Sequence, residues 1–245
     1  AIKAKGDTVD VAVFNDWADS FILKSIDNGD TWTRTTFIDF PVDRYITDSG
    51  IDLDHSCFRN ATAIGGVGSE FNGQDAVVSP SPTHRKILLY NSSIDGGDTP
   101  GHMDYRHGTH VAGSLACHDV YAYAGGEKPT NASTMSYGAK IIFQDIVSAD
   151  GWNPPENVTD LLMENSLYGG VIHSNSWGDD TTAYTARSGG FDLWALEVPW
   201  SLAFVAPGNT GAQLLEPANA RNVVAVGAST KSASPTLWPS SSIGP

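Results

Sequence analysis

Basic side chains and cysteines are scarce in this chain of 245 residues. Only 14 Lys and Arg stand against 28 Asp and Glu, which gives a formal charge of −14. Nucleic-acid binding requires clustered Lys and Arg, and anionic membrane surfaces attract basic segments. The composition therefore argues against both partners. The 2 cysteines exclude a scaffold of several disulfides but leave open one bridge or two buried thiols.

Long apolar runs are absent as well. No stretch approaches the ~18 consecutive apolar residues that a membrane-spanning helix needs. The chain opens on Ala1 without a leader of basic and then apolar residues, so we expect a signal peptide to be absent or already removed. With 40% hydrophobic residues the chain is too apolar for a disordered acidic tail. Its length allows a globular protein with a large core.

Four Asn-X-Ser/Thr triplets are present, and each is a potential N-glycosylation site. One triplet is a weak signal, because polar loops generate such triplets by chance. Together they favour a secreted glycoprotein, and that oxidising compartment favours a bridge between Cys57 and Cys117. The four candidate acceptors are Asn60, Asn91, Asn131 and Asn157.

Strand and helix signals alternate through most of the chain. Continuous apolar runs, typical of strands buried on both faces, occur at residues 86–90, 140–144, 171–173, 202–206 and 222–226. Helices are predicted over residues 107–117, 156–168 and 190–198. Apolar residues should cluster on two of these helices: Val158, Leu161, Leu162 and Leu167 on one, and Phe191, Leu193, Trp194 and Leu196 on the other. The alternation predicts an α/β fold, with a doubly wound, mostly parallel sheet and helices on both faces.

The first 44 residues have a different character. Residues 25–32 read Ser-Ile-Asp-Asn-Gly-Asp-Thr-Trp and resemble the Asp-box hairpin turn of sialidase-like β-propellers. Asn28-Gly29 is a favourable pair for a tight turn between two strands. A propeller requires several blades, and the chain has no second such box. We therefore expect a β-hairpin appendage over residues 1–44, followed by a domain over residues 45–245.

Three polar residues lie at the ends of predicted strands or at the start of a predicted helix, where catalytic side chains often occur. Asp48 ends a short strand, where open α/β sheets build their sites, although a solvated turn is the alternative. His107 opens a helix, and His110 on the same helix face leaves a metal site as a competing interpretation. Asn209 follows an apolar strand and is either an oxyanion donor or a plain turn residue.

Five segments, in this order, resemble the subtilisin-like serine peptidases (subtilases). Residues 48–52, Asp-Ser-Gly-Ile-Asp, are similar to the aspartate motif of that family. Residues 107–113, His-Gly-Thr-His-Val-Ala-Gly, are similar to its histidine motif without a mismatch. The other three segments, 174–178, 206–209 and 222–228, resemble the substrate-binding edge, the oxyanion segment and the strand that follows. The resemblance covers roughly residues 45–245 and implies a subtilisin-like fold that is incomplete at its C-terminus.

The resemblance also implies hydrolysis of peptide bonds by an Asp-His-Ser triad. In that mechanism His107 takes the proton of the attacking serine and later gives it to the leaving amine. Asp48 orients the imidazole, and Asn209 donates to the oxyanion. An extended peptide or protein substrate would lie along the segment at residues 174–178. One of its side chains would enter the space between that segment and residues 206–208. The substrate-binding residues implied are Ser174, Asn175, Ser176, Trp177, Gly178, Ala206, Pro207 and Gly208.

The family's Gly-Thr-Ser-Met-Ala-like nucleophile motif is missing from residues 1–245. The nearest string, Ser133-Thr134-Met135-Ser136, precedes the predicted strand at Lys140, which is the wrong order for the family, and it lacks both the glycine and the helix. We therefore expect this chain alone to be inactive, with the serine on a second chain or on unrecorded residues. The C-terminal portion or another subunit would cover the truncated face. The alternative is a catalytically inactive pseudopeptidase that acts as a secreted, glycosylated structural or binding module.

No cofactor is implied by these motifs. Subtilases often bind calcium, and the loop at residues 95–98, Asp-Gly-Gly-Asp, is acidic enough to suggest it. Acidic loops are more often merely solvated, so the sequence assigns no metal ligand.

Overall fold

The computed structural model describes residues 2–5, 8–14, 20–25, 33–36, 44–53, 55–59, 84–91, 105–119, 133–148, 151–152 and 154–244. The first four strands form a sheet of their own, antiparallel throughout. These strands are β1 (Ile2–Lys5), β2 (Thr8–Phe14), β3 (Ser20–Ser25) and β4 (Thr33–Thr36). The Asp-box-like segment joins β3 to β4, but its turn lies outside the described residues.

A six-stranded sheet organises the remainder, in the order β12-β11-β10-β5-β7-β6, and every neighbouring pair is parallel. Its strands are β5 (Arg44–Asp48), β6 (Ile87–Asn91), β7 (Ile141–Asp145), β10 (Ile172–Asn175), β11 (Leu202–Val205) and β12 (Val224–Ala225). A short antiparallel pair, β8 (Val147–Ser148) and β9 (Gly151–Trp152), follows β7. Each apolar run that predicted a strand contributes to the parallel sheet, and all five residues of β7 are buried.

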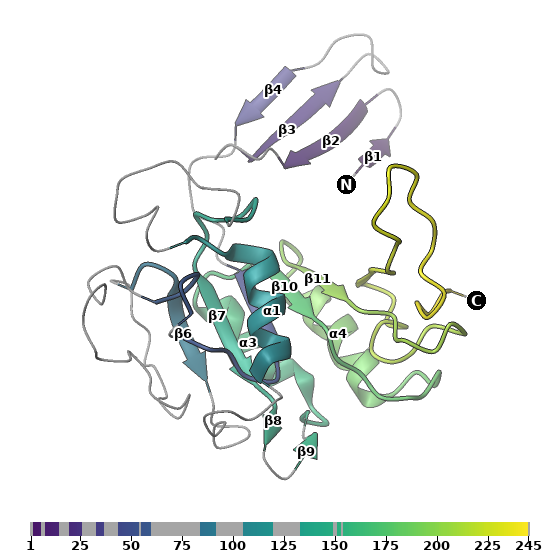
Figure 1. Ribbon diagram of the computed structural model, residues 1–245. Coiled ribbons are helices and arrows are strands. Elements are labelled where there is room, and N and C mark those ends of the chain that lie inside the picture. Colours follow the sequence, from purple (N-terminus) through teal and green to yellow (C-terminus); the bar gives the residue numbers. More distant parts are fainter. Residues whose placement is uncertain are drawn as a thin grey trace.

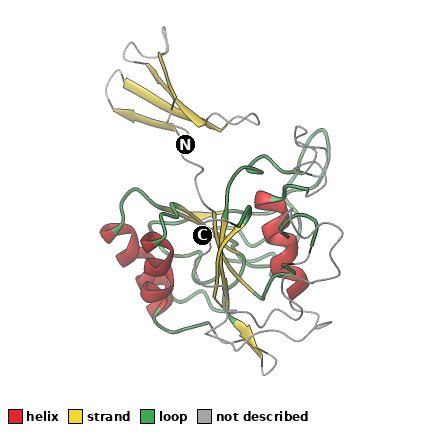
Figure 2. Ribbon diagram, turned by 90° about the vertical axis from the view of Figure 1, so that its left-hand side faces the viewer, coloured by secondary structure: helices red, strands yellow, loops and turns green. Residues whose placement is uncertain are grey.

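Helices cover both faces of this sheet (Figures 1 and 2). Helix α1 (Tyr105–Ala116) lies on one face, while α3 (Val158–Leu167) and α4 (Ala186–Glu197) lie together on the other. The doubly wound α/β fold predicted from the sequence is confirmed.

Two apolar clusters fill the space between the helices and the sheet. The cluster beneath α1 includes Ile46, Ile51, Phe58, Ala112 and Phe143. The cluster beneath α3 and α4 includes Leu161, Leu162, Phe191, Trp194 and Val205.

Three leucines predicted to join the second cluster instead face solvent. Leu167, Leu193 and Leu196 have exposed fractions of 79%, 48% and 74%. Leu167 is the last residue of α3, where Gly169 at a φ of 81° ends the helix. Leu193 and Leu196 are exposed because α4 turns the face with Phe191 and Trp194 toward the sheet, so the predicted clustering was wrong for these leucines.

Polar caps fix where α3 and α4 begin. The side chain of Asn157 accepts a hydrogen bond from the Thr159 amide at 3.1 Å. Thr185 accepts one from the Ser188 amide at 3.4 Å. Each cap satisfies one of the amides that a first helical turn leaves unpaired. Within the described part of the chain, none of the helices is long and apolar enough to cross a membrane.

Candidate active site

Asp48 and His107 meet at the carboxyl end of the parallel sheet. Asp48 is the last residue of β5, and His107 lies in the first turn of α1. The His107 Nδ1 atom is 2.7 Å from the Asp48 Oδ1 atom. The carboxylate side chain is almost fully buried, with 3% exposed, whereas 58% of the imidazole is exposed. One ring nitrogen is thus held by a buried acid, and the ring still reaches solvent.

The carboxylate of Asp48 is oriented by its immediate neighbour. Its Oδ1 atom accepts hydrogen bonds from the Ser49 amide at 2.7 Å and from the Ser49 hydroxyl at 3.1 Å. Because Oδ1 also faces Nδ1, the His107 proton is directed to that nitrogen, and Nε2 is left available as a base.

The first turn of α1 packs directly on the loop after β5. Gly50 lies in this loop at a φ of 76°, which favours glycine. A Cβ atom added to Gly108 would lie 2.0 Å from the Gly50 carbonyl oxygen and 2.8 Å from the Phe143 ring. The Thr109 hydroxyl accepts a hydrogen bond from the Asp52 amide at 2.7 Å. Close backbone contact therefore sets the position of His107 relative to Asp48.

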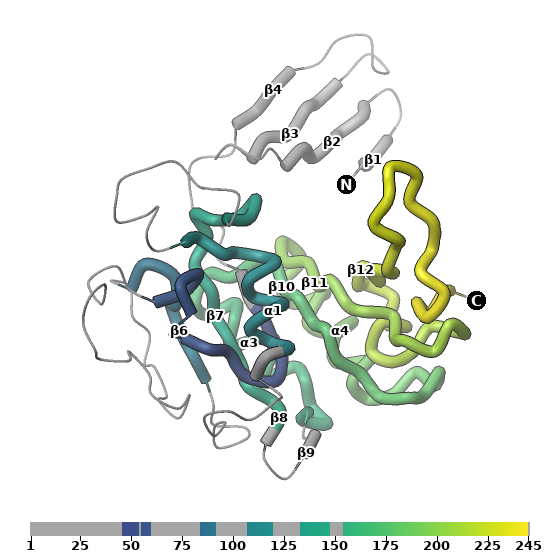
Figure 3. The backbone as a smooth tube through the Cα atoms, in the orientation of Figure 1, coloured from purple at the N-terminus to yellow at the C-terminus, as the bar shows by residue number. Residues whose placement is uncertain are grey.

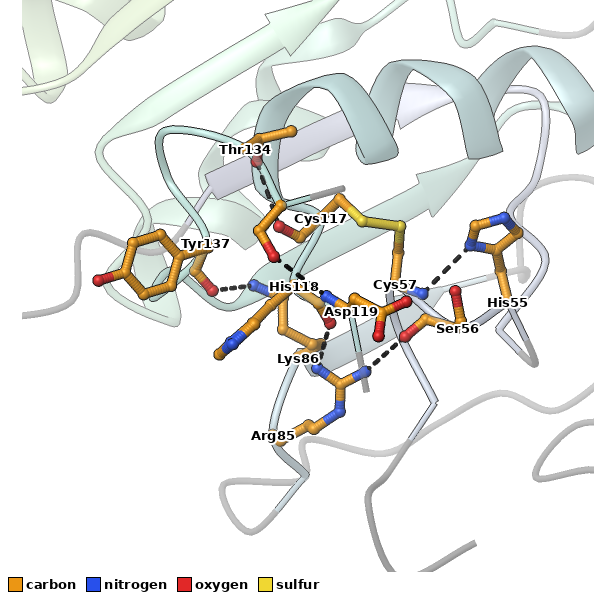
Figure 4. Close-up of a disulfide and its surroundings, with 11 residues drawn as sticks. His55, Ser56, Cys57, Arg85, Lys86, Cys117, His118, Asp119, Thr134 and Tyr137 are labelled. Carbon is orange, nitrogen blue, oxygen red and sulfur yellow. Dashed lines mark hydrogen bonds between the residues drawn. A yellow bond between two sulfur atoms is a disulfide. The ribbon is translucent and has the colours of Figure 1, made fainter. Parts of the chain in front are cut away.

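A disulfide ties the other end of α1 to the same loop (Figure 4). Cys57 follows the β5 loop, Cys117 follows α1, and their Cα atoms are 4.6 Å apart. The predicted Cys57–Cys117 bridge is confirmed. Arg85 braces both sides, because its guanidinium donates to the carbonyls of Ser56 at 3.0 Å and His118 at 2.8 Å. Asp48 and His107 are thus carried by two segments that a covalent bond joins.

Asp48 raises the pKa of His107 above its ordinary value. The hydrogen bond to the carboxylate is the largest cause, and the charge of Asp48 adds to it, while partial burial opposes both. Below the unfolded His pKa of about 6.5 the ring is charged in the folded and unfolded chains, and the pair contributes its full stability. That contribution is lost as pH rises through the raised folded pKa.

We expect Asp48→Asn to lower the pKa of His107, because the variant removes the negative charge. The midpoint of the His107 ring resonance in an NMR titration measures this. The stability that the variant loses should also be greater near pH 5.5 than near pH 8.5, since the charged ring gains more from the carboxylate than the neutral ring does. Equal midpoints in the two proteins would contradict the assignment.

The strand register aligns two further segments with Asp48. Thr47 pairs with Asn175 of β10, and Asn175 pairs with Val205 of β11. The next residues along the three strands, Asp48, Ser176 and Ala206, therefore continue as one row. Adjacent strands are ~4.8 Å apart, so the row spans the carboxyl edge of the sheet over roughly 10 Å.

A pocket of about 610 Å³ opens between the ends of β10 and β11. Six residues predicted from the sequence line it: Ser176, Trp177, Gly178, Ala206, Gly208 and Asn209. Asn209 is exposed there, and its side chain is not engaged by any residue that the structure describes. Ser174, Asn175 and Pro207 do not line the pocket, because the first two lie in β10 and Pro207 is buried.

The rest of the pocket wall was missed by the sequence analysis. These lining residues are Asp179, Asp180, Thr210, Leu215 and Glu216. Glu216 is 1% exposed, and its Oε1 atom accepts from the Asp179 amide at 3.3 Å. Arg187 in α4 binds both Asp179 and Glu216. These partners are 8 and 29 residues from Arg187 along the chain, so no local motif signals the cluster.

Two of the four predicted glycosylation sites lie among the described residues. Asn157 is exposed at the start of α3, whereas the Asn91 amide donates to both carboxylate oxygens of Glu164 at 2.9 Å. Asn60, Asn131 and the acidic loop at residues 95–98 lie outside the described residues. Among the described residues, no group of three His, Cys, Asp or Glu side chains could hold a metal ion.

Comparison with known proteins places this geometry in a family. A sequence model of the subtilase family matches residues 46–245, and curated protein sequences yield no match. Among solved structures, a mutant of the protease domain of PatA matches with a TM-score of 0.56 at 20% identity, over 83% of this chain and 62% of that one. The prenylagaramide maturation protease PagA matches with a TM-score of 0.54 at 19% identity, over 84% and 59%. A lanthipeptide protease matches with a TM-score of 0.51 at 20% identity, over 83% and 52%.

At these identities the structural likeness concerns the fold. The chain spans about 60% of the length of the first two solved proteases. The sequence match itself extends from the residue after Tyr45 to the end of the chain, and it includes both the aspartate and the histidine segments. The chain belongs to the subtilase family.

Proposed function

We propose that this chain supplies the acid–histidine pair and the substrate pocket of a secreted serine endopeptidase of the subtilisin type. The observation that carries the proposal is the contact of 2.7 Å between buried Asp48 and half-exposed His107 at the carboxyl end of the sheet. The nucleophilic serine lies on a segment outside residues 1–245, because residues 1–245 contain no Gly-Thr-Ser motif.

The roles that we propose for these groups are those that the resemblance to the subtilases implies. The incoming serine hydroxyl loses its proton to His107 Nε2 as its oxygen attacks the peptide carbonyl. Asp48 holds the proton on Nδ1 and stabilises the imidazolium that forms. The Asn209 amide donates to the oxyanion as negative charge develops on the carbonyl oxygen. His107 then returns the proton to the leaving amine, and water releases the acyl group by the same steps.

The substrate lies along the segment that follows β10. Ser176, Trp177 and Gly178 continue the chain beyond the carboxyl end of β10, and the backbone of an extended peptide pairs with this segment. The substrate side chain next to the scissile bond then enters the pocket between this segment and Ala206. Gly178 lets this segment pack closely on the loop that carries Glu216, because a Cβ atom at this position would lie 2.2 Å from the Glu216 carbonyl oxygen.

An exposed apolar face beside β12 is where the serine-bearing segment docks. β12 is the edge strand of the described sheet, and Figure 3 traces the chain from it toward the C-terminus. Exposed apolar side chains of this size usually mark a contact surface. The exposed large apolar residues of β12 and of the described chain after it are Val224, Val226, Leu237, Trp238 and Ile243.

Active-site labelling tests the proposal. A fluorophosphonate should label the protein isolated from its natural source at a serine outside residues 1–245, while the recombinant chain of residues 1–245 should remain unlabelled. Peptide mass spectrometry locates the label. Amide exchange at β12 should be slower in the natural protein than in the recombinant chain, because the docked segment covers the edge.

Two results would count against the proposal. A labelled serine within residues 1–245 would overturn the placement of the nucleophile. A natural protein that resists labelling and ends at Pro245 would favour the inactive binding module. For the secreted form, Asn157 is the glycan acceptor that we propose among the described triplets, because its side chain is exposed.

A further inference from the structure

We infer that the pocket beside Asn209 selects substrates with a basic side chain, Lys or Arg, at the residue before the scissile bond. This inference rests on the proposed function, because it assigns a ligand to the same groove. It goes further by naming the charge of the substrate side chain that the pocket binds and the residue that binds it.

The ionisable residues that line the pocket are all acidic. They are Asp179, Asp180 and Glu216, and no Lys, Arg or His is among the lining residues that the structure describes. The apolar part of the wall comes from Trp177, Leu215 and Ala206. A side chain with an apolar stem and a cationic end matches this division, because Lys and Arg pack their methylenes on apolar surface and keep their charge at a polar end.

One cation already lies behind this wall. Arg187 binds Asp179 and lies 3.3 Å from Glu216 Oε1, while Glu216 Oε2 accepts from the Thr185 hydroxyl at 2.6 Å. Arg187 does not line the pocket. Its single charge engages two of the three carboxylates, Asp179 and Glu216, so the wall retains net negative charge.

Asp180 is the carboxylate free to receive a ligand. It is exposed, and it makes no side-chain hydrogen bond or ion pair with any residue in the described ranges. Asp179 and Glu216 instead engage Arg187, which holds them in place. Asp180 is therefore the specificity-determining residue, and the buried Glu216 adds long-range attraction to the same cation.

Neutral substrates lack a compensating charge. An apolar side chain that filled the pocket would displace water from the carboxylates and would offer them no hydrogen bond or opposite charge in its place. Removing water from an unpaired charged group costs free energy, so such substrates should bind less tightly. Citrulline has the shape of arginine without its charge, so it separates the effect of charge from that of size.

Peptide binding to the chain of residues 1–245 tests the inference without requiring catalysis. The probes are acetyl-Ala-Ala-Pro-X-amide peptides with X as arginine, citrulline or leucine, and calorimetry or fluorescence anisotropy measures Kd. We expect arginine to bind about 10-fold more tightly than citrulline, with a ratio that shrinks as salt is raised. Asp180→Asn should reduce that ratio to about 3-fold or less, whereas Glu197→Gln, an exposed carboxylate at the end of α4, should leave it unchanged.

Each other outcome is decisive. Equal affinity for the three peptides, or preference for leucine, overturns the basic specificity and leaves the peptide groove intact. Preference for arginine that survives Asp180→Asn overturns the role of Asp180. If none of the peptides binds, both this inference and the proposed substrate groove fail.

Discussion

Replacement of His107 with alanine is expected to reduce kcat of the complete peptidase by about 10⁶-fold, the size of loss that accompanies removal of a triad histidine. The reason is the contact of 2.7 Å between His107 Nδ1 and Asp48. In the proposed mechanism that contact leaves Nε2 as the general base, and a variant without the imidazole has no group to take the proton of the serine. Hydrolysis of a fluorogenic peptide by the full-length natural protein and its variant measures the effect.

His110 offers a matched control on the same helix. It is exposed and lies three residues further along α1, on the face that the sequence analysis considered for a metal site. His110→Ala should change kcat by less than about twofold, because no step of the triad mechanism uses it. Loss of activity in both variants would instead indicate that the two histidines act together. Retention of activity in His107→Ala would remove His107 from the mechanism.

Replacement of Gly108 with alanine is expected to destabilise the chain by about 1–3 kcal/mol or more, the usual cost of adding volume to a packed interior. The added Cβ atom would meet the Gly50 carbonyl oxygen at 2.0 Å and the Phe143 ring at 2.8 Å. The helix or the loop after β5 must move apart to accept it. Urea unfolding of the two proteins measures the loss.

The same substitution at Gly113 is expected to stabilise the chain rather than destabilise it. It also lies in α1, but a Cβ atom there would meet nothing within 4 Å. Gly113→Ala should raise the free energy of unfolding by about 0.5–1 kcal/mol, because alanine favours the helix. Similar shifts in both variants would show that helix propensity, rather than contact with Gly50, decides the outcome at Gly108.

The sequence predicted the parallel sheet well because its strands are short and continuously apolar. Burial on both faces makes β7 uniformly hydrophobic at Ile141, Ile142 and Phe143, a pattern that is visible without tertiary information. The exposed sides of α3 and α4 were harder to predict. Leu193 and Leu196 are as apolar as their buried neighbours, and only the angle at which α4 meets the sheet decides which of them face it.

The candidate site also contains some residues that the sequence predicted and others that it did not. Asp48 and His107 were predictable because each lies in a contiguous motif, and Cys57 and Cys117 because they were the only pair available. The acidic wall was not predictable. Arg187, Asp179 and Glu216 come from α4 and from two loops, and each alone is an ordinary charged residue. Only the folded chain reveals that Asp179 and Glu216 share a pocket with Asp180 and that Arg187 binds both of them from outside it.

The bridge between Cys57 and Cys117 would also keep the chain in one covalent molecule after hydrolysis of a peptide bond between the two cysteines. The two cysteines are separated by 60 positions along the sequence, and Asp48 precedes the first while His107 lies between them. Hydrolysis of any one peptide bond between Cys57 and His107 would leave Asp48 and His107 on different fragments that remain one covalent molecule. A peptidase nicked there, by itself or by another enzyme, would separate into two pieces only after reduction.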